Sequence, residues 1–122
     1  MKRLTPKEEQ IMQILWRIGK GYVRDILEQL PEPQSSYTTI STIIRILEKK
    51  GFIGHRVFGN THEYYPRIEK NSYLRFYMRS IVRTYFEDSY RELVSFFARE
   101  EQLEPKDLEK LLEQIRKQKK NG

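Results

Sequence analysis

Residues 35–66 read SSYTTISTIIRILEKKGFIGHRVFGNTHEYYP, and this stretch decides the fold. Its first half predicts a helix from about Thr38 to Lys50, with Gly51 as the residue that ends it. On a helical wheel the branched apolar side chains gather on one side, and the hydroxyl and basic side chains gather on the other. The apolar side consists of Ile40, Ile43, Ile44 and Leu47. The pattern therefore predicts a helix with a buried back and an open front.

The second half of the stretch predicts a β-hairpin. Two extended runs, 52–58 and 61–65, flank the dipeptide Gly59-Asn60, which is typical of a tight turn. Pro66 is expected to end the second run. A helix followed by a hairpin matches the last part of a winged helix-turn-helix, in which the third helix reads DNA.

Two further helices are predicted ahead of this stretch. In the first, Thr5 can act as the N-cap, and Glu8 completes a capping box. Apolar residues then recur at helical spacing, at Ile11, Ile14, Leu15 and Ile18. The second helix is expected over about 22–30, and the prolines of residues 31–36, PEPQSS, predict a connector that breaks it. We therefore expect a winged-helix DNA-binding domain over residues 1–68.

Composition limits the classes of function. The chain has 122 residues, a net charge of +6 and a pI of about 9.5, which favours an anionic partner. It has no cysteine, which excludes disulfides, thiolate metal sites and cysteine nucleophiles. The N-terminus lacks the apolar core of a signal sequence, and no run approaches the ~18 apolar residues of a membrane span. We expect a cytoplasmic protein with no membrane insertion.

The open front of the helix over 38–50 has the chemistry of a recognition helix. Short side chains let such a helix enter a major groove about 12 Å wide, where hydroxyls can bond to base edges or phosphates. Arg45 and Lys49 are long enough to reach a phosphate or a guanine edge. The polar residues of the hairpin can contact the DNA backbone. The predicted DNA-binding residues are Thr38, Thr39, Ser41, Thr42, Arg45, Lys49, Arg56, Asn60 and Thr61.

Each of these features has a plainer interpretation. Thr and Ser are also common caps and surface residues, an Arg/Lys face is usually solvated, and a hairpin can simply be exposed. His55 and His62 can face each other across the strands, but without cysteine or a group of carboxylates they make a poor metal site. The sequence has no Gly-rich phosphate loop, HExxH motif or nucleophile–base pair, so neither an enzyme nor a cofactor is expected.

The second half of the chain is rich in aromatic residues, with eight Phe or Tyr residues within 73–97. Three helices are expected there, over about 70–86, 89–101 and 105–117, followed by a frayed tail. Such helices would expose large apolar patches in a monomer, so residues 69–122 are expected to form a helical dimerisation region. The predicted dimer interface consists of Leu74, Tyr77, Ile81, Tyr85, Leu93, Phe97, Leu108, Leu111, Leu112 and Ile115. Two alternatives stay open: the aromatic side chains pack on the winged helix of a monomer, or they form a pocket for an aromatic small molecule.

Several segments resemble the penicillinase repressor family, the BlaI/MecI/CopY-type bacterial transcriptional repressors. The resemblance covers residues 4–115 and rests on LTPKEEQIMQILW, TISTIIRILEKKGFI and FGNTHEYYP, and on the later segment ELVSFFAREEQL. It implies an N-terminal winged helix and a C-terminal dimerisation part. It also implies a homodimer that binds palindromic operators and blocks transcription.

In the best-known branch of this family, a membrane-bound sensor metalloprotease detects β-lactams, and the repressor is then cleaved. The cut lies in a segment that matches SFFARE, residues 95–100, so the resemblance implies cleavage at Phe96 and Phe97 and a role in an antibiotic response. Family members often have Asn-Phe at this point, where this chain has Phe-Phe. The copper-responsive branch ends in a cysteine-rich motif that this chain lacks, so copper sensing is not expected.

These observations predict a homodimeric repressor that reads a palindromic operator in double-stranded DNA through the helix over 38–50 and is released by proteolysis. Two other hypotheses are a winged-helix regulator switched by a small ligand and a winged-helix module that contacts only other proteins.

Overall fold

The computed structural model describes residues 1–31 and 35–121, so residues 32–34 of the predicted helix-breaking connector lie outside the described residues. The chain divides into two compact units, Met1–Tyr77 and Met78–Gly122, and each is described by itself. No helix in the described part of the chain is long and apolar enough to cross a membrane.

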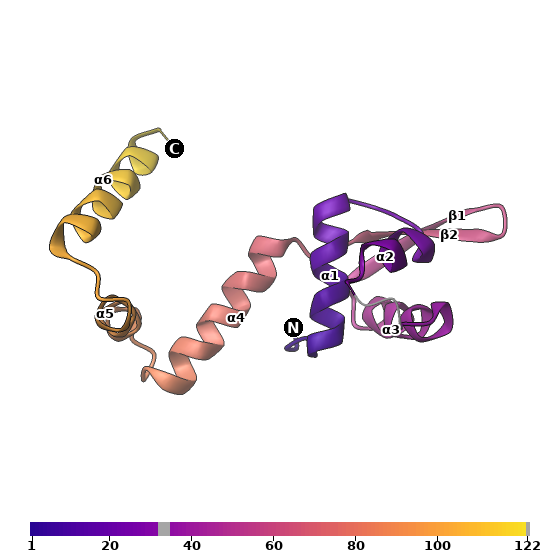
Figure 1. The fold of residues 1–122 in the computed structure, drawn as a ribbon, viewed down its shortest axis with the longest axis horizontal. Helices are drawn as coiled ribbons and strands as arrows, with labels where there is room; N and C mark the ends of the chain where they lie inside the picture. The colour runs from indigo at the N-terminus through magenta and orange to yellow at the C-terminus, as the bar shows by residue number, and fades with distance from the viewer. Residues whose placement is uncertain (32–34, 122) are drawn as a thin grey trace. The chain divides into compact units, whose positions relative to one another are not determined.

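The N-terminal unit has the predicted order of three helices and a hairpin, followed by the start of a fourth helix (Figure 1). Its elements are α1 (Pro6–Ile18), α2 (Val23–Gln29), α3 (Tyr37–Lys49), β1 (Ile53–Phe58), β2 (Thr61–Pro66) and the first half of α4 (Lys70–Tyr85). The predicted ends agree with these bounds to within one or two residues. The fold prediction, mainly α with a small β-hairpin in a winged helix-turn-helix, is confirmed.

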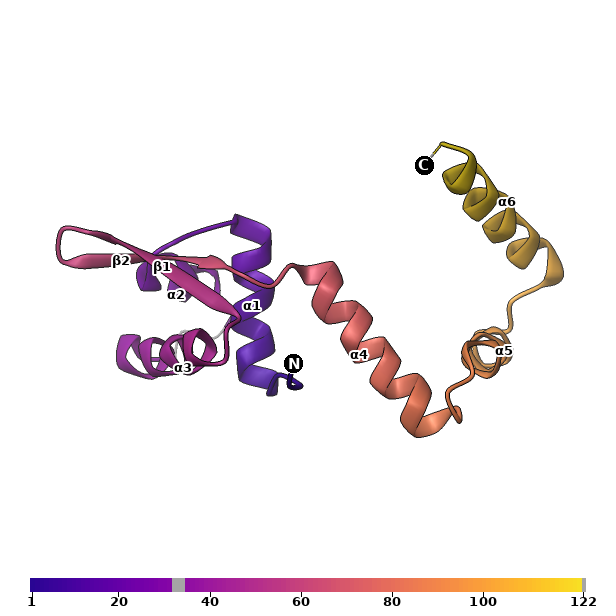
Figure 2. The ribbon, with the colours of Figure 1, turned by 180° about the vertical axis from the view of Figure 1, so that it is seen from behind.

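The hairpin is an antiparallel pair in which Ile53 lies opposite Pro66 and Phe58 lies opposite Thr61. Seen from behind in Figure 2, β1 and β2 extend alongside α3. The base of the hairpin is held by the segment between α1 and α2. There, Gly21 N donates to the Tyr64 carbonyl at 2.9 Å, and Tyr64 N donates to the Gly21 carbonyl at 2.7 Å. These two main-chain hydrogen bonds attach the wing to the segment between α1 and α2.

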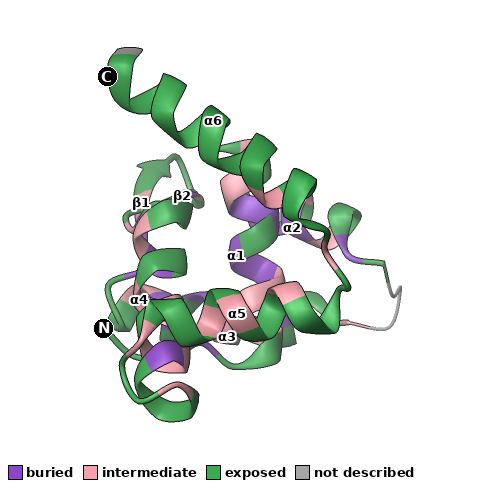
Figure 3. Ribbon diagram, turned by 90° about the vertical axis from the view of Figure 1, so that its left-hand side faces the viewer, coloured by how far each residue is buried: buried purple, intermediate pink, exposed green. Residues whose placement is uncertain are grey.

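The core of this unit lies between the three helices and the start of β1. Figure 3 colours the buried residues purple. Fully buried members include Ile11, Met12, Leu15, Ile26, Ile40, Ile44, Leu47, Phe52 and Ile53. Burying a Leu, Ile or Phe side chain contributes about 1.5–3 kcal/mol, so this cluster is the main stabilising element of the unit.

Tyr73 attaches α4 to this core. Its hydroxyl accepts a hydrogen bond from Leu4 N at 2.9 Å, and its ring packs edge-on against Phe52 with 5.8 Å between centroids. One turn later, Arg3 donates to the Tyr77 hydroxyl at 2.7 Å. The alternative in which aromatic side chains pack on the winged helix therefore holds for these two tyrosines. It gives Tyr77, a predicted dimer contact, a partner within its own chain.

A buried carboxylate joins α1 to the end of α3. Glu8 is only 4% exposed, and Lys50 Nζ lies 2.8 and 3.0 Å from its two carboxylate oxygens. The predicted capping box is also present, because Thr5 N donates to Glu8 Oε1 at 2.9 Å. Burial by itself raises the pKa of Glu8, but the bonds from Lys50 and from the Thr5 backbone outweigh it, so the pKa lies below its usual value.

Glu8→Gln is expected to lower the unfolding free energy by about 2 kcal/mol at pH 7, because Lys50 then faces a neutral amide. A carboxyl with a lowered folded-state pKa stabilises the protein above its unfolded pKa of about 4.3, and this contribution is lost as the pH falls through the folded pKa. The difference in unfolding free energy between parent and variant should therefore disappear at acidic pH. Urea unfolding at pH 7 and at pH 3 measures it, with Glu9→Gln in the same helical turn as the control. An equal effect of both variants would contradict the assignment.

The C-terminal unit contains the rest of α4, α5 (Tyr90–Glu100) and α6 (Pro105–Asn121). Val82 is fully buried, and the rings of Phe86 and Phe96 pack at 5.6 Å between centroids. No residue of α5 is buried, and α6 is exposed over almost its whole length (Figure 3). The predicted end of the last helix, at about Lys117, is too early, because α6 continues to Asn121.

Candidate nucleic-acid interface

The hydroxyl residues at the start of α3 have two structural tasks. Ser36 is the N-cap, and its Oγ accepts a hydrogen bond from Thr39 N at 3.1 Å. The Thr42 hydroxyl donates to the Thr38 carbonyl at 2.9 Å, so its proton is used within the helix and only its lone pairs remain available. Part of the hydroxyl content therefore builds the helix end, which sequence analysis placed at Thr38 without identifying Ser36 as the cap.

The two sides of α3 differ in burial as the helical wheel predicts. Ile40, Ile44 and Leu47 are fully buried, and Ile43 is half-buried. The predicted DNA-binding residues of α3 lie on the other side. Thr38, Thr39, Thr42, Arg45 and Lys49 are exposed and Ser41 is half-buried. This open side is called the reading face below.

The wing presents two different faces. Arg56 lies on the same face as Tyr65, with its guanidinium carbon 5.8 Å from the ring centroid. At the tip, Thr61 Oγ1 donates to the Phe58 carbonyl at 2.7 Å and closes the turn. The three predicted wing residues, Arg56, Asn60 and Thr61, are all exposed. They are therefore available to a partner.

A hollow of about 560 Å³ separates the reading face from the wing. It brings together four of the predicted residues, namely Ser41 and Arg45 from α3 and Asn60 and Thr61 from the wing tip. Its other lining residues are Tyr22, Val23, Arg24, Asp25, Tyr37, His62 and Tyr64. The remaining predicted residues, Thr38, Thr39, Thr42, Lys49 and Arg56, do not line it.

This surface also contains Tyr22, Arg24 and Tyr37, which the sequence pattern did not predict. Arg24 is exposed at the start of α2, and Tyr37 is 59% exposed at the start of α3. The sequence did contain a signal for them, because an arginine and a tyrosine stand at the starts of two consecutive helices. It could be used only once α2 and α3 were known to place those starts at one hollow.

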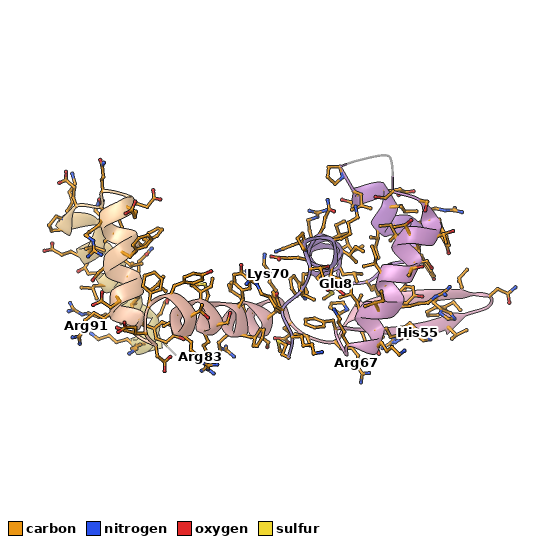
Figure 4. All side chains as sticks on the ribbon, turned by 90° about the horizontal axis from the view of Figure 1, so that it is seen from below. Glu8, His55, Arg67, Lys70, Arg83 and Arg91 are labelled. Carbon is orange, nitrogen blue, oxygen red and sulfur yellow. The ribbon has the colours of Figure 1, made fainter. Side chains whose placement is uncertain are left out.

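The two histidines lie on the other wing face, where the wing meets α3. As predicted, they face each other, with their rings stacked at 4.3 Å between centroids and 7° between planes. His55 Nδ1 also bonds to the Glu48 carboxylate of α3 (Figure 4 labels His55). Burial, and then the nearby Glu48 charge, raises the pKa of the neighbouring Tyr64 phenol. In the described part of the chain, no group of three or more His, Asp or Glu side chains is placed to hold a metal ion.

Three helices and a hairpin, with an open polar helix face beside the wing, define a winged-helix protein of the DNA-reading class. The family model described as "Penicillinase repressor" matches residues 4–117, and the chain belongs to the penicillinase repressor family. Its members regulate transcription, so the protein is a regulator rather than an enzyme.

Individual relatives agree with this assignment. The penicillinase repressor of Bacillus licheniformis is 24% identical over 120 residues, which are 98% of this chain and 93% of that protein. The methicillin resistance regulatory protein MecI of Staphylococcus aureus is 25% identical over 109 residues, which are 88% of this chain and 89% of that protein. The solution structure of the DNA-binding domain of the repressor BlaI superposes with a TM-score of 0.51 at 26% identity. That match covers 60% of this chain and 94% of the BlaI chain.

Proposed function

We propose that the protein is a homodimeric transcriptional repressor that binds a palindromic DNA operator and inserts the reading face of α3 into the major groove. The observation that carries this proposal is the reading face itself. Its largely exposed hydroxyl and basic side chains lie opposite a largely buried apolar side of α3, beside a wing with polar residues. A helix held this way can enter a groove without disturbing the core.

The hollow beside the reading face supports the same arrangement. With α3 in the major groove, the hollow between α3 and the wing faces the adjoining sugar-phosphate backbone. Arg24 on its wall supplies positive charge, and Asn60 and Thr61 supply hydrogen-bonding groups. Backbone contacts of this kind set the register of the protein, while base contacts from α3 set the sequence.

Dimerisation through residues 69–122 is supported by apolar side chains that the single chain leaves open. Leu74, Tyr85, Phe97, Leu111, Leu112 and Ile115 are each more than 40% exposed. Ile81, Leu93 and Leu108, also predicted dimer contacts, are half-buried. Soluble monomers rarely leave so many large apolar side chains exposed. A two-fold partner would cover it and would present two reading faces to a palindromic site.

A footprint on the DNA upstream of the gene that encodes the chain tests the function. The full-length protein is expected to protect two half-sites related by a two-fold axis and separated by about one helical turn, at about 150 mM salt. Sequence-independent protection that disappears with moderate salt would show charge attraction alone and would contradict operator reading.

We further propose that cleavage in α5 releases the repressor, with a membrane-bound sensor metalloprotease as the candidate partner. Phe96 and Phe97 are 46% and 56% exposed, and α5 contains no buried residue. A protease needs an extended segment, and a helix with so few buried contacts opens at little cost in free energy.

A chain that ends after Phe96 is expected to bind the operator at least about 100-fold more weakly than the full chain, because α6 and the last turn of α5 are missing from the dimer region. The N-terminal unit should stay folded, since its core lies wholly within residues 1–77. Gel shift measures the affinity, and circular dichroism of the truncated chain is the control for folding. Unchanged affinity would rule out release by this cut.

A further inference from the structure

The contact between Glu48 and His55 joins two elements that both belong to the proposed DNA surface. Glu48 lies in α3 and His55 lies in β1, and the side chains of both are 31% exposed. In the part of the chain that the structure describes, this side-chain contact ties α3 to the wing, whereas the Lys50–Glu8 ion pair ties the end of α3 to α1. The wing is therefore fastened to the recognition helix itself as well as to the base of the fold.

Aromatic contacts continue this connection into the fold. His62 of β2 stacks in parallel on His55, and the Tyr64 ring meets both imidazoles edge-on, at 5.9 and 6.1 Å between centroids. Tyr64 is only 5% exposed, and its main chain is bonded to Gly21. An unbroken set of contacts thus runs from Glu48 through the wing to the segment between α1 and α2.

The charge of Glu48 is unfavourable for the proposed function. A carboxylate close to a DNA-binding surface repels phosphate, so a neutral residue there would strengthen binding by charge alone. The bond from Glu48 to His55 can offset this repulsion only if it contributes to DNA binding in another way. The bond joins α3 to β1, so it can set the direction of the wing relative to α3.

We propose that Glu48, His55 and His62 form a strut that holds the wing at a fixed angle to α3, so that the wing tip and the reading face engage one duplex together. This inference rests on the proposed DNA-binding function. The three side chains are positioning residues: they act through the wing and do not touch the bases.

The strut can be tested first in the free full-length protein. In Glu48→Ala, amide order parameters of residues 53–66 are expected to fall below the value of about 0.85 that is typical of a rigid backbone. Residual dipolar couplings of the wing should no longer fit the alignment of α3. Glu48→Gln keeps an amide that can bond to the imidazole and should retain both signals. An equally rigid wing in Glu48→Ala would overturn the proposal.

DNA binding gives the second test. Glu48→Ala and His55→Ala are each expected to weaken operator binding about tenfold, as for the loss of one hydrogen bond to a charged group. The double variant should be no weaker than the weaker single variant, because both changes remove the same bond. Hydroxyl-radical footprints should lose protection at the outer backbone, where the wing lies, and keep it over the half-site centres.

Glu63→Ala is the matched control, because it removes a carboxylate from β2 opposite Arg56, on the wing face that does not meet α3. It should leave operator affinity unchanged or raise it. If Glu48→Ala behaves in the same way, charge alone explains the residue and the strut is wrong. Failure of the proposed function can be distinguished from failure of the strut. If the function is wrong, the parent chain protects no palindrome. The order parameters of its wing would still test the strut.

Discussion

Leu111→Asp is expected to convert the protein from a dimer into a monomer at micromolar concentration and to abolish tight operator binding. Leu111 is 50% exposed in the single chain, on a helical stripe of four apolar residues. The other three are Leu108, Leu112 and Ile115. In a two-fold interface each substitution occurs twice, so two carboxylates would lie in apolar surroundings without a partner.

The expected effect on the dimer is large for two reasons. The substitution removes a favourable apolar contact, and it adds an unfavourable carboxylate in its place. Burying one unpaired polar group costs roughly 2–3 kcal/mol, so two copies raise the dimer dissociation constant about 1,000-fold or more. Sedimentation velocity measures the oligomeric state, and gel shift measures DNA binding. Gln114→Asp is the matched control, because it adds the same charge to an exposed residue outside the stripe. If Leu111→Asp remained a dimer, α6 would not be part of the interface.

Arg45→Ala is expected to weaken operator binding by about 100-fold or more without lowering the stability of the fold. A bidentate arginine–guanine contact is worth about 1–3 kcal/mol, and a dimer makes it twice. Arg45 is exposed on the reading face and lines the hollow beside the wing. Fluorescence anisotropy on a labelled operator duplex measures the loss, and thermal unfolding checks the fold. If the variant bound the operator as tightly as the parent, the reading face of α3 would not be the side that faces DNA.

Two companion variants define what Arg45 does. Arg45→Lys keeps the charge but not the planar fork, so a base contact predicts a large loss while a phosphate contact predicts a small one. Arg17→Ala removes the same charge from an exposed position of α1 and should have little effect. Thr42→Ala should cost less than Arg45→Ala, because its hydroxyl proton is already bonded to the Thr38 carbonyl.

Local features of this fold follow from the sequence because their causes are local. The Thr5–Glu8 capping box, the buried back of α3 and the turn at Gly59-Asn60 each depend on residues within one or two turns of one another. Helix periodicity shows that one side of α3 is buried, and it is. It does not show which partner covers it.

The contacts that sequence analysis missed join distant segments. Glu8 and Lys50 are 42 residues apart, and Leu4 and Tyr73 are 69 residues apart, so no pattern within one element marks them. Gly21 pairs with Tyr64 as a single residue, which carries no strand signal. The end of α6 was placed too early for a different reason. Its last residues are Lys and Gln, which have good helix propensity even though no apolar residue follows Ile115.

The attachment of α4 by Tyr73 has a consequence for how proteolysis would act. The bond from Leu4 to Tyr73 precedes the proposed cut, so severed molecules keep complete reading units and lose only their tether. While joined, one bound unit supplies the other at an effective concentration on the order of millimolar; once separated, each must find its half-site from bulk solution. Derepression would then be a loss of avidity. Each separated N-terminal unit would keep its sequence preference, but its residence time on the half-site would be much shorter.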